Sequence, residues 1–171
     1  SVYDLLGREL PRMNAVGRLD LNSEGLLLFS NDGELVNLLT HPRNQVPRVY
    51  RVRAHGGFSE ATMNKLRAKG VELDDGPTGP LEIDIGPKES GSNRWYEITL
   101  REGRNREGRR IFEAIGLTVN RLLRIAYGGV ELGPLQKGLW RLLTEQEMRK
   151  LRREAASPDS RPKKSASSKS G

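Results

Sequence analysis

The sequence predicts an α+β fold, with a mixed, largely antiparallel β-sheet and flanking helices. Short apolar runs typical of strands alternate irregularly with segments of helical periodicity along the chain. Several of the predicted strands are neighbours in sequence, which favours antiparallel pairing. The chain has 171 residues, 35% of them hydrophobic. It is therefore long enough for one domain with a sizeable core.

The first predicted elements are a buried strand and a helix. Residues 25–30 (GLLLFS) form a continuous apolar run bounded by turn residues, as expected for a buried strand. The NDG sequence at 31–33 predicts a turn, in which the Asp32 side chain can cap the helix that follows. That helix, within GELVNLLTHP, should end at Pro42.

A second strand and a second helix come next. Residues 48–56 alternate with a period of two, so the predicted strand places Tyr50 on the same face as Val52. Residues 59–70 predict a helix with a serine cap and a glycine stop. The later predicted elements are strands at 81–86, 94–100 and 119–132, a loop leading into a helix at 102–116, and a closing helix at 144–154.

The composition excludes several kinds of site. Cysteine is absent, so disulfides and thiolate zinc sites cannot form, and His41 and His55 are the only imidazoles. No phosphate-binding P-loop, dinucleotide fingerprint or nucleophile elbow occurs. No stretch approaches the roughly 20 apolar residues of a membrane span, and no signal peptide is recognisable. We expect a soluble, cytoplasmic protein that uses neither a metal nor a cofactor.

The net charge of +7 is unevenly distributed. Residues 149–171 hold eight basic against two acidic residues, so the rest of the chain is nearly neutral. Residues 157–171 are rich in Ser, Lys and Pro, without apolar periodicity, and predict a disordered basic tail. Such a tail serves either as a solubilising appendage or as an electrostatic tether to RNA phosphates.

The sequence GRLD at 17–20 is the first candidate for chemistry. In an extended segment Arg18 and Asp20 face the same side, while Leu19 and Leu21 can anchor the opposite face in the core. This geometry would hold a carboxylate rigidly at a surface cleft. The simpler interpretation is a solvated charge pair, which contributes only about 0–1 kcal/mol.

Tyr50 and the arginine-rich stretch LREGRNREGRRIF are the other candidates. Tyr50 is either a core tyrosine with its hydroxyl at the rim or a ring that stacks on a flipped base. Five arginines between 101 and 110 surround a loop and the first turn of a helix. Because the guanidinium fork matches phosphate oxygens, this stretch favours an RNA or polyanion surface.

Together, VGRLDLNSEGLLLFSNDGEL, RVYRV and EGRNREGRRIFEAIGLTVNRLLRIAYGGVEL resemble the motifs of a known family. In order and spacing they are similar to the bacterial ribosomal RNA pseudouridine synthases, which comprise type A for the small ribosomal subunit, with types B, E and F for the large one. The arginine-rich motif is closest to type B. The resemblance implies the pseudouridine synthase catalytic fold around a central cleft. It also implies isomerisation of a uridine to pseudouridine, in 23S rRNA for type B, without metal or cofactor.

The resemblance also implies roles for single residues. Asp20 matches the essential aspartate, which acts as a nucleophile or stabilises charge at the ribose. Tyr50 matches the tyrosine that packs on the flipped uracil and is implicated in removing the C5 proton, and Arg109 matches the basic residue that pairs with the aspartate. The expected contacts to the RNA backbone are Arg18, Arg104, Asn105, Arg106 and Arg110. The implied partner is a ribosomal RNA stem-loop bound by a monomer. The alternative is a non-catalytic RNA-binding or ribosome-assembly module that keeps the fold.

The extent of the resemblance predicts the domain organisation. We assign residues 1–156 to the catalytic domain and 157–171 to the tail. The family normally begins with a small S4-type RNA-binding module and a strand carrying a Lys-Pro-x-Gly motif, and neither is present in this sequence. The chain is then either a fragment of a longer protein or a reduced enzyme in which another segment replaces the missing strand, and we favour the fragment. Gly108 stands where the family has an aliphatic residue, and a glycine there should loosen the placement of Arg109.

Overall fold

A computed structural model describes residues 6–7, 10–89 and 91–156. Its main feature is a six-stranded sheet with the order β10-β9-β4-β8-β7, to which β2 adds alongside β9. The β2–β9 pair is parallel and the other neighbours in this sheet are antiparallel. The strands are β2 (Glu24–Gly25), β4 (Arg48–His55), β7 (Glu82–Lys88), β8 (Asn93–Leu100), β9 (Thr118–Tyr127) and β10 (Val130–Glu131).

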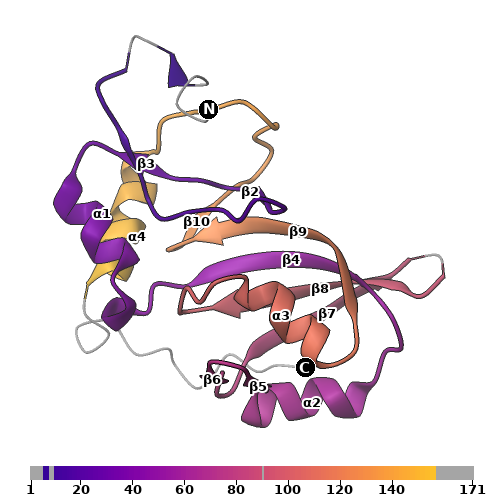
Figure 1. Cartoon of the computed structure of the whole chain (residues 1–171). Coiled ribbons are helices and arrows are strands. Elements are labelled where there is room, and N and C mark those ends of the chain that lie inside the picture. Colours follow the sequence, from indigo (N-terminus) through magenta and orange to yellow (C-terminus); the bar gives the residue numbers. More distant parts are fainter. Residues whose placement is uncertain (1–5, 8–9, 90, 157–171) are drawn as a thin grey trace.

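Helices lie at two separate places around this sheet (Figure 1). Two helices lie against the sheet, one beside β7 and the other beside β9, and two others lie side by side near β10. The first pair is α2 (Glu60–Lys69) and α3 (Glu107–Ala114), and the second is α1 (Gly33–Thr40) and α4 (Glu145–Ala155). A 3-10 helix (Pro42–Asn44) and two short ladders complete the fold: β1 (Asn14–Ala15) with β3 (Phe29–Ser30), and β5 (Glu72–Leu73) with β6 (Gly76–Pro77).

Two apolar cores hold these elements together. The first core packs α2 and α3 against the sheet, and the rings of Tyr96 and Phe112 lie 5.2 Å apart within it. The second core packs α1 and α4 around Tyr127 and Val130, at the ends of β9 and β10. Val16 and Leu26 belong to the second core, so the GRLD segment between them is attached to that side of the molecule.

The predicted helix starts are confirmed by side-chain capping. The Asp32 carboxylate accepts a hydrogen bond from the Leu35 amide at 3.2 Å, and the Ser59 hydroxyl accepts one from Thr62 at 3.2 Å. Thr144 forms a reciprocal capping box with Glu147 at the start of α4. Each cap satisfies amides that have no partner inside the helix.

The strand predicted at 25–30 is not continuous. Its two ends belong to different ladders, β2 on β9 and β3 on β1. The backbone between them also changes partner, because Leu26 donates to Arg124 whereas Leu28 accepts from Val16. Leu26 and Leu28 are buried as expected. The apolar run thus predicted burial correctly, but it carried no information about which backbone each residue would pair with.

Two further differences concern turns. The strand predicted over 119–132 is divided by a turn at Gly128 and Gly129, both at positive φ, into the antiparallel pair β9 and β10. The ladder of β5 and β6 was not predicted. The proposed tail at 157–171 lies outside the described residues. In the part of the chain that the structure describes, no helix is long and apolar enough to cross a membrane.

Gly108 occupies the first turn of α3 in a conformation open to any residue. A Cβ atom placed there would lie 3.8 Å from the side chains of both Leu100 and Leu122, which is ordinary van der Waals contact. We therefore expect Gly108→Ala to raise the free energy of unfolding by about 0.5–1 kcal/mol in urea titrations, because alanine favours the helix. The matched control is Gly116→Ala, at φ +85° just after the helix, which should destabilise the protein. A lower stability for Gly108→Ala would contradict the packing described here.

Candidate active site

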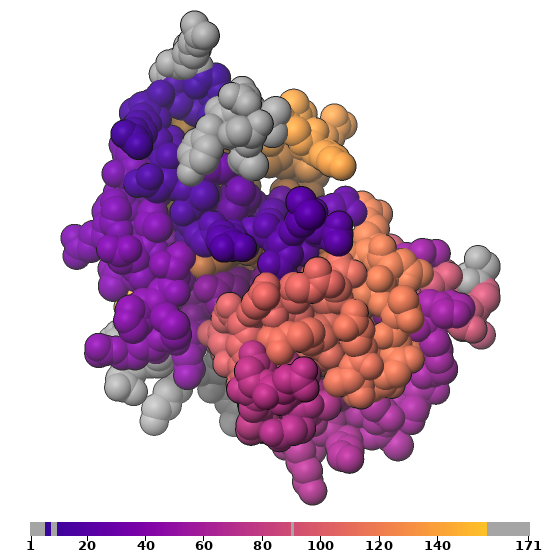
Figure 2. Space-filling view, in the orientation of Figure 1, coloured from indigo at the N-terminus to yellow at the C-terminus, as the bar shows by residue number. Residues whose placement is uncertain are grey.

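Asp20 lies at the start of a tight turn. The Ser23 amide donates to the Asp20 carbonyl at 2.9 Å and closes the turn over residues 20–23. The Arg109 guanidinium, from α3, donates to the Asn22 carbonyl at 3.2 Å and to the Val119 carbonyl at 3.4 Å. In Figure 2 this N-terminal segment, drawn in indigo, rests on the surface formed by α3 and β9. Arg109, on a helix of the first core, therefore contacts the turn, whereas Val16 and Leu26, on either side of the turn, pack in the second core.

A second arginine ties down the residues on both sides of the turn. Arg124, on β9, is 2% exposed and donates to the Leu26 carbonyl at 2.9 Å and to the Arg18 carbonyl at 3.5 Å. Its guanidinium also lies 5.0 Å from the centre of the Tyr127 ring. A buried guanidinium needs such partners because desolvation of a charge is costly. Arg124 thus links the Asp20 segment to the sheet.

Gly25 allows this segment to approach β9 closely. It has φ +112° and pairs with Arg124 in the parallel ladder. A Cβ atom on residue 25 would collide with the backbone of Arg124. The neighbouring Glu24 carboxylate receives two hydrogen bonds from Arg121, at 3.0 and 3.2 Å, which lower the pKa of Glu24. A residue without a side chain is therefore required where the turn joins the sheet.

One pocket brings together side chains from the GRLD segment, from the strand that carries Tyr50 and from the arginine-rich stretch. Asp20 and Arg18 line it from the turn, Tyr50 from β4, and Arg104 from the loop before α3. The Tyr50 ring is half-buried and packs against the first core, as expected for a tyrosine at the rim of a core, and it also lines the pocket. Asn105, Arg106, Arg109 and Arg110 do not line this pocket.

The position of Leu21 differs from the prediction. Leu19 is half-buried and lines the pocket, but Leu21 is 97% exposed. The alternation of faces assumed for 17–21 ends at Asp20, because the chain turns there instead of remaining extended. Alternation in the sequence is informative only while the backbone stays extended.

The expected ion pair between Asp20 and Arg109 is also absent. The Asp20 carboxylate makes no hydrogen bond or ion pair with any residue that the structure describes, and Arg109 instead contacts backbone carbonyls. Arg109 therefore contacts the peptide of Asn22, two residues beyond Asp20. Arg109 thus contacts the backbone of the turn and not the Asp20 carboxylate.

The arginine-rich stretch is partly occupied by contacts within the chain. Asp75 receives hydrogen bonds from Arg110 to both oxygens at 3.0 Å and one from Arg104 at 3.3 Å, which lower the pKa of Asp75. Arg104 also donates to the Gly76 and Pro77 carbonyls. Arg106 is exposed, adopts φ +53° just before α3, and its side chain has no partner among the described residues. The arginines of the predicted phosphate-binding surface therefore fall into two groups. Arg104 and Arg110 are engaged by Asp75, whereas the Arg106 side chain has no such contact within the described residues.

Glu107 is the functional candidate that the sequence interpretation missed. It lines the same pocket as Asp20 and Tyr50, and the residue is 3% exposed. Burial, followed by the neighbouring Glu102 carboxyl, raises the pKa of Glu107 to about 8 against the lowering influence of Arg104 and Arg110. In the sequence Glu107 is one acidic residue within a run of arginines, and nothing in the spacing indicated that it would be buried.

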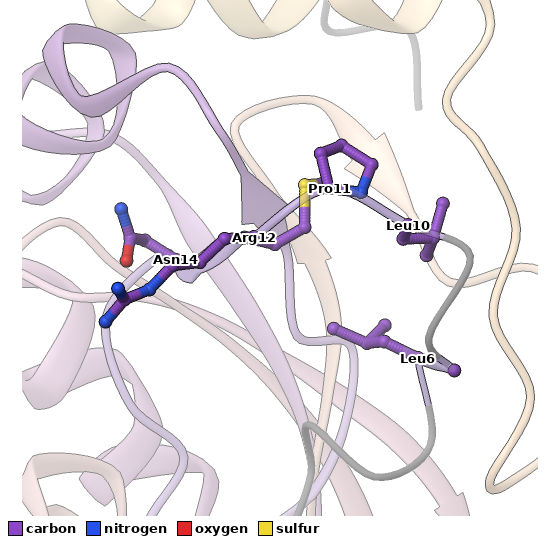
Figure 3. Close-up of a pocket in the computed structure, with 7 residues that line it drawn as sticks. Leu6, Leu10, Pro11, Arg12 and Asn14 are labelled. Atoms are coloured by element: carbon purple, nitrogen blue, oxygen red, sulfur yellow. The ribbon is translucent and has the colours of Figure 1, made fainter.

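A second and wider pocket is formed by residues of the N-terminal segment (Figure 3). Its side chains are mostly apolar or neutral, and Figure 3 shows Arg12 and Asn14 on the side opposite Leu6 and Leu10. None of the described residues that line it carries a carboxylate, imidazole or hydroxyl group. We therefore place the candidate active site at Asp20 and not here. Within the described residues, no group of three acidic or histidine side chains could hold a metal ion.

Comparison with known proteins gives the family to which this fold belongs. Residues 3–114 match the family described as RNA pseudouridylate synthase, and the chain belongs to this family. A crystal structure of a pseudouridylate synthase superimposes with a TM-score of 0.77 at 27% identity, covering 88% of this chain and 65% of that one. The predicted fold class is therefore confirmed.

Particular relatives are more similar still in sequence. Ribosomal large subunit pseudouridine synthase B of Escherichia coli (strain K12) is 49% identical over 140 residues, which are 81% of this chain and 46% of the relative. The protein of the same name from Haemophilus influenzae is 46% identical over 154 residues, or 89% of this chain and 43% of the relative. The chain thus spans about half the length of the curated relatives it matches.

A more distant structure shares the fold alone. An H/ACA RNP bound to a substrate RNA containing 2′-deoxyuridine contains a chain that superimposes with a TM-score of 0.55 at 17% identity. The match covers 76% of this chain and 42% of the other.

Proposed function

We propose that this protein isomerises a specific uridine of ribosomal RNA to pseudouridine, and that the RNA is 23S rRNA. The observation that carries the proposal is a carboxylate without a partner among the described residues, Asp20, in a pocket lined by Tyr50. The 49% identity to relatives named ribosomal large subunit pseudouridine synthase B supports the choice of RNA. The cytoplasm, where ribosomal RNA is made, is the proposed site of action, and the enzyme acts as a monomer.

The reaction exchanges one bond to the ribose for another. The bond between uracil N1 and the ribose C1′ breaks, a bond between C5 and C1′ forms, the C5 proton leaves and N1 gains a proton. The uridine must first leave its stack, which costs a few kcal/mol. Asp20 then acts on the ribose, as a nucleophile or as a charge that stabilises it, while the Tyr50 ring packs on the uracil and its phenol is placed to remove the C5 proton.

Arg109 is proposed as a positioning residue. Its guanidinium donates to the carbonyls of Asn22 and Val119, so it fixes the turn between α3 and β9. A carboxylate must be held to within a fraction of an ångström of its reacting atom to act efficiently. The contribution of Arg109 is thus to the placement of Asp20.

Contacts to the RNA backbone would come from the arginines that remain free. Arg18 and Arg106 are exposed and have no side-chain partner among the described residues, and Asn105 is exposed beside them. Arg104 and Arg110 can contribute only while they share their charge with Asp75. Such contacts position a stem-loop by its phosphates and shape without reading its sequence.

Arg106→Gln should weaken RNA binding equally for all RNA sequences. Loss of one phosphate contact should reduce the slope of log affinity against log salt by about one. The control is Arg141→Gln, since Arg141 is occupied by two hydrogen bonds of 2.7 Å to Glu147. Filter binding of a labelled 23S rRNA transcript over a range of salt concentrations measures both slopes. An unchanged slope in Arg106→Gln would remove this residue from the proposed surface.

Tritium release from RNA labelled at uridine C5 tests the whole proposal. The protein should release tritium from an in vitro 23S rRNA transcript, because the C5 proton is lost to solvent when pseudouridine forms. Salt-dependent RNA binding without tritium release would instead favour a non-catalytic RNA-binding or ribosome-assembly module. A 16S rRNA transcript processed in parallel tests the choice of RNA.

A further inference from the structure

The pocket contains a buried carboxyl group that the described residues satisfy only in part. The Glu107 side chain is 2% exposed, and as a carboxylate it has no hydrogen-bond donor among the described residues. A protonated Glu107 can hydrogen-bond to the neighbouring Glu102 carboxyl, whose side chain is 40% exposed. Arg104 Nε lies 3.5 Å from Oε2, within ion-pair distance, but it makes no hydrogen bond to it. A buried polar group with incomplete hydrogen bonding is destabilising, so a ligand in the pocket that completes it would bind favourably.

The positive charges around Glu107 do not compensate a negative charge on its carboxyl group. On its own helix lies Arg110, which bonds to Asp75, and in the preceding loop lie Glu102 and Arg104. Arg104 is shared between Asp75, Glu102 and Glu107. From the opposite side, the pocket is lined by Arg18, Asp20 and Tyr50. Burial, and then the nearby Glu102 carboxyl, favour the neutral form of the Glu107 carboxyl and raise its pKa, and Arg104 and Arg110, which also serve other carboxylates, oppose this only in part.

A neutral carboxyl group presents one hydrogen-bond donor and one acceptor side by side. The polar edge of uracil presents the complementary pair, the N3–H donor next to a carbonyl acceptor. A carboxylate could only accept, and would face the uracil carbonyl with an unfavourable like charge. The chemistry of the site therefore matches a flipped uracil only when Glu107 is protonated.

We infer that Glu107 is a catalytic residue that holds the flipped uracil by two hydrogen bonds, one accepted from N3–H and one donated to an adjacent carbonyl oxygen. This inference rests on the proposed function, because it requires a uracil in the pocket. It gives the base a fixed orientation while Asp20 acts on the ribose. It also accounts for a glutamate that is buried within an arginine-rich motif.

Three variants separate this role from a structural one. Glu107→Gln keeps a donor and an acceptor, Glu107→Ala removes both, and Glu113→Gln changes an exposed glutamate of the same helix as a control. Single-turnover tritium release from the 23S rRNA transcript is measured between about pH 6.5 and 9.5, with RNA affinity measured alongside. Glu107→Ala should lose about 100-fold in rate near pH 7, because both hydrogen bonds to the base are gone.

Glu107→Gln gives the more specific readout. The wild-type rate should fall about tenfold between pH 7 and 9 as Glu107 ionises around its pKa of about 8. Glu107→Gln should stay within about threefold of the wild type at pH 7 and should not show this fall, since an amide does not titrate in this range. RNA affinity should be the same in all four proteins, because phosphate contacts supply most of it.

Several outcomes overturn the inference. It is wrong if Glu107→Ala reacts within about threefold of the wild type at pH 7, or if Glu107→Gln is as slow as Glu107→Ala while its circular dichroism spectrum is unchanged. If Glu107→Gln does not fold, a wild-type rate that stays level or rises from pH 7 to about 9.5 is sufficient to reject it. A wild type that releases no tritium at any pH contradicts the proposed function itself, and the inference falls with it.

Discussion

Asp20→Asn should lower tritium release by at least about 1,000-fold while leaving RNA affinity within about twofold of the wild type. Asparagine has the same shape as aspartate but carries no charge and is not a nucleophile. The Asp20 carboxylate makes no hydrogen bond or ion pair within the described part of the chain, so the substitution removes no contact that the fold needs. The loss should therefore appear in the rate and not in the stability.

A matched control distinguishes a specific effect from loss of a negative charge. Asp84 is exposed on β7, away from the pocket. Asp84→Asn changes the net charge by the same amount and should react at the wild-type rate. Full activity in Asp20→Asn, with the same fold and RNA affinity, would show that the chemistry is carried by another group.

Gly25→Ala should lower the free energy of unfolding by about 3 kcal/mol or more. The substitution adds a Cβ atom that collides with the Arg124 backbone, in a conformation at φ +112° that alanine adopts only under strain. The β2–β9 ladder must open to accommodate it. Since β2 follows the turn at 20–23, tritium release should decline in the same variant. Urea titration followed by circular dichroism measures the stability.

Gly33→Ala is the control for the general cost of replacing a glycine. Gly33 begins α1, and a Cβ atom there meets no neighbouring atom within 4 Å. Its stability should be unchanged or slightly raised, because alanine is the better helix former. Equal stabilities for the two variants would mean that β2 does not approach β9 as closely as described.

Much of the fold could be predicted because local patterns were strong. The strand at 48–55 has the expected alternation, and Asp32, Ser59 and Thr144 all cap helices as predicted. The run at 25–30 was predicted less well, since its leucines are buried but its two ends pair with different strands. Burial follows from side-chain chemistry, whereas the pairing partner depends on contacts between distant segments.

The candidate site was predictable only in part. The motifs located Asp20 and Tyr50, which do line one pocket. They did not indicate that Arg109 would contact the Asn22 carbonyl, or that Asp75, far upstream in the sequence, would occupy Arg104 and Arg110.

Arg124 and Glu107, the two buried charged residues discussed above, differ in how far the sequence could have indicated their burial. Arg124 could have been noticed, since an arginine on the same strand face as Leu122 is unusual. Glu107 gave no such signal, because the burial of a charged side chain depends on its three-dimensional surroundings.

The attachment of the Asp20 segment to two cores has a consequence for how the protein moves. Val16 and Leu26 belong to the core around α1 and α4, whereas Arg109 and β9 hold the turn from the other core. Proteins open locally in cooperative units that cost less than complete unfolding. The short ladder at 24–25 joins the Asp20 segment to β9 through only two residue pairs, so we expect it to open before the longer ladders of the sheet. Asp20 would then move away from Tyr50 while the sheet remains intact, and the proposed activity should be lost before the protein unfolds.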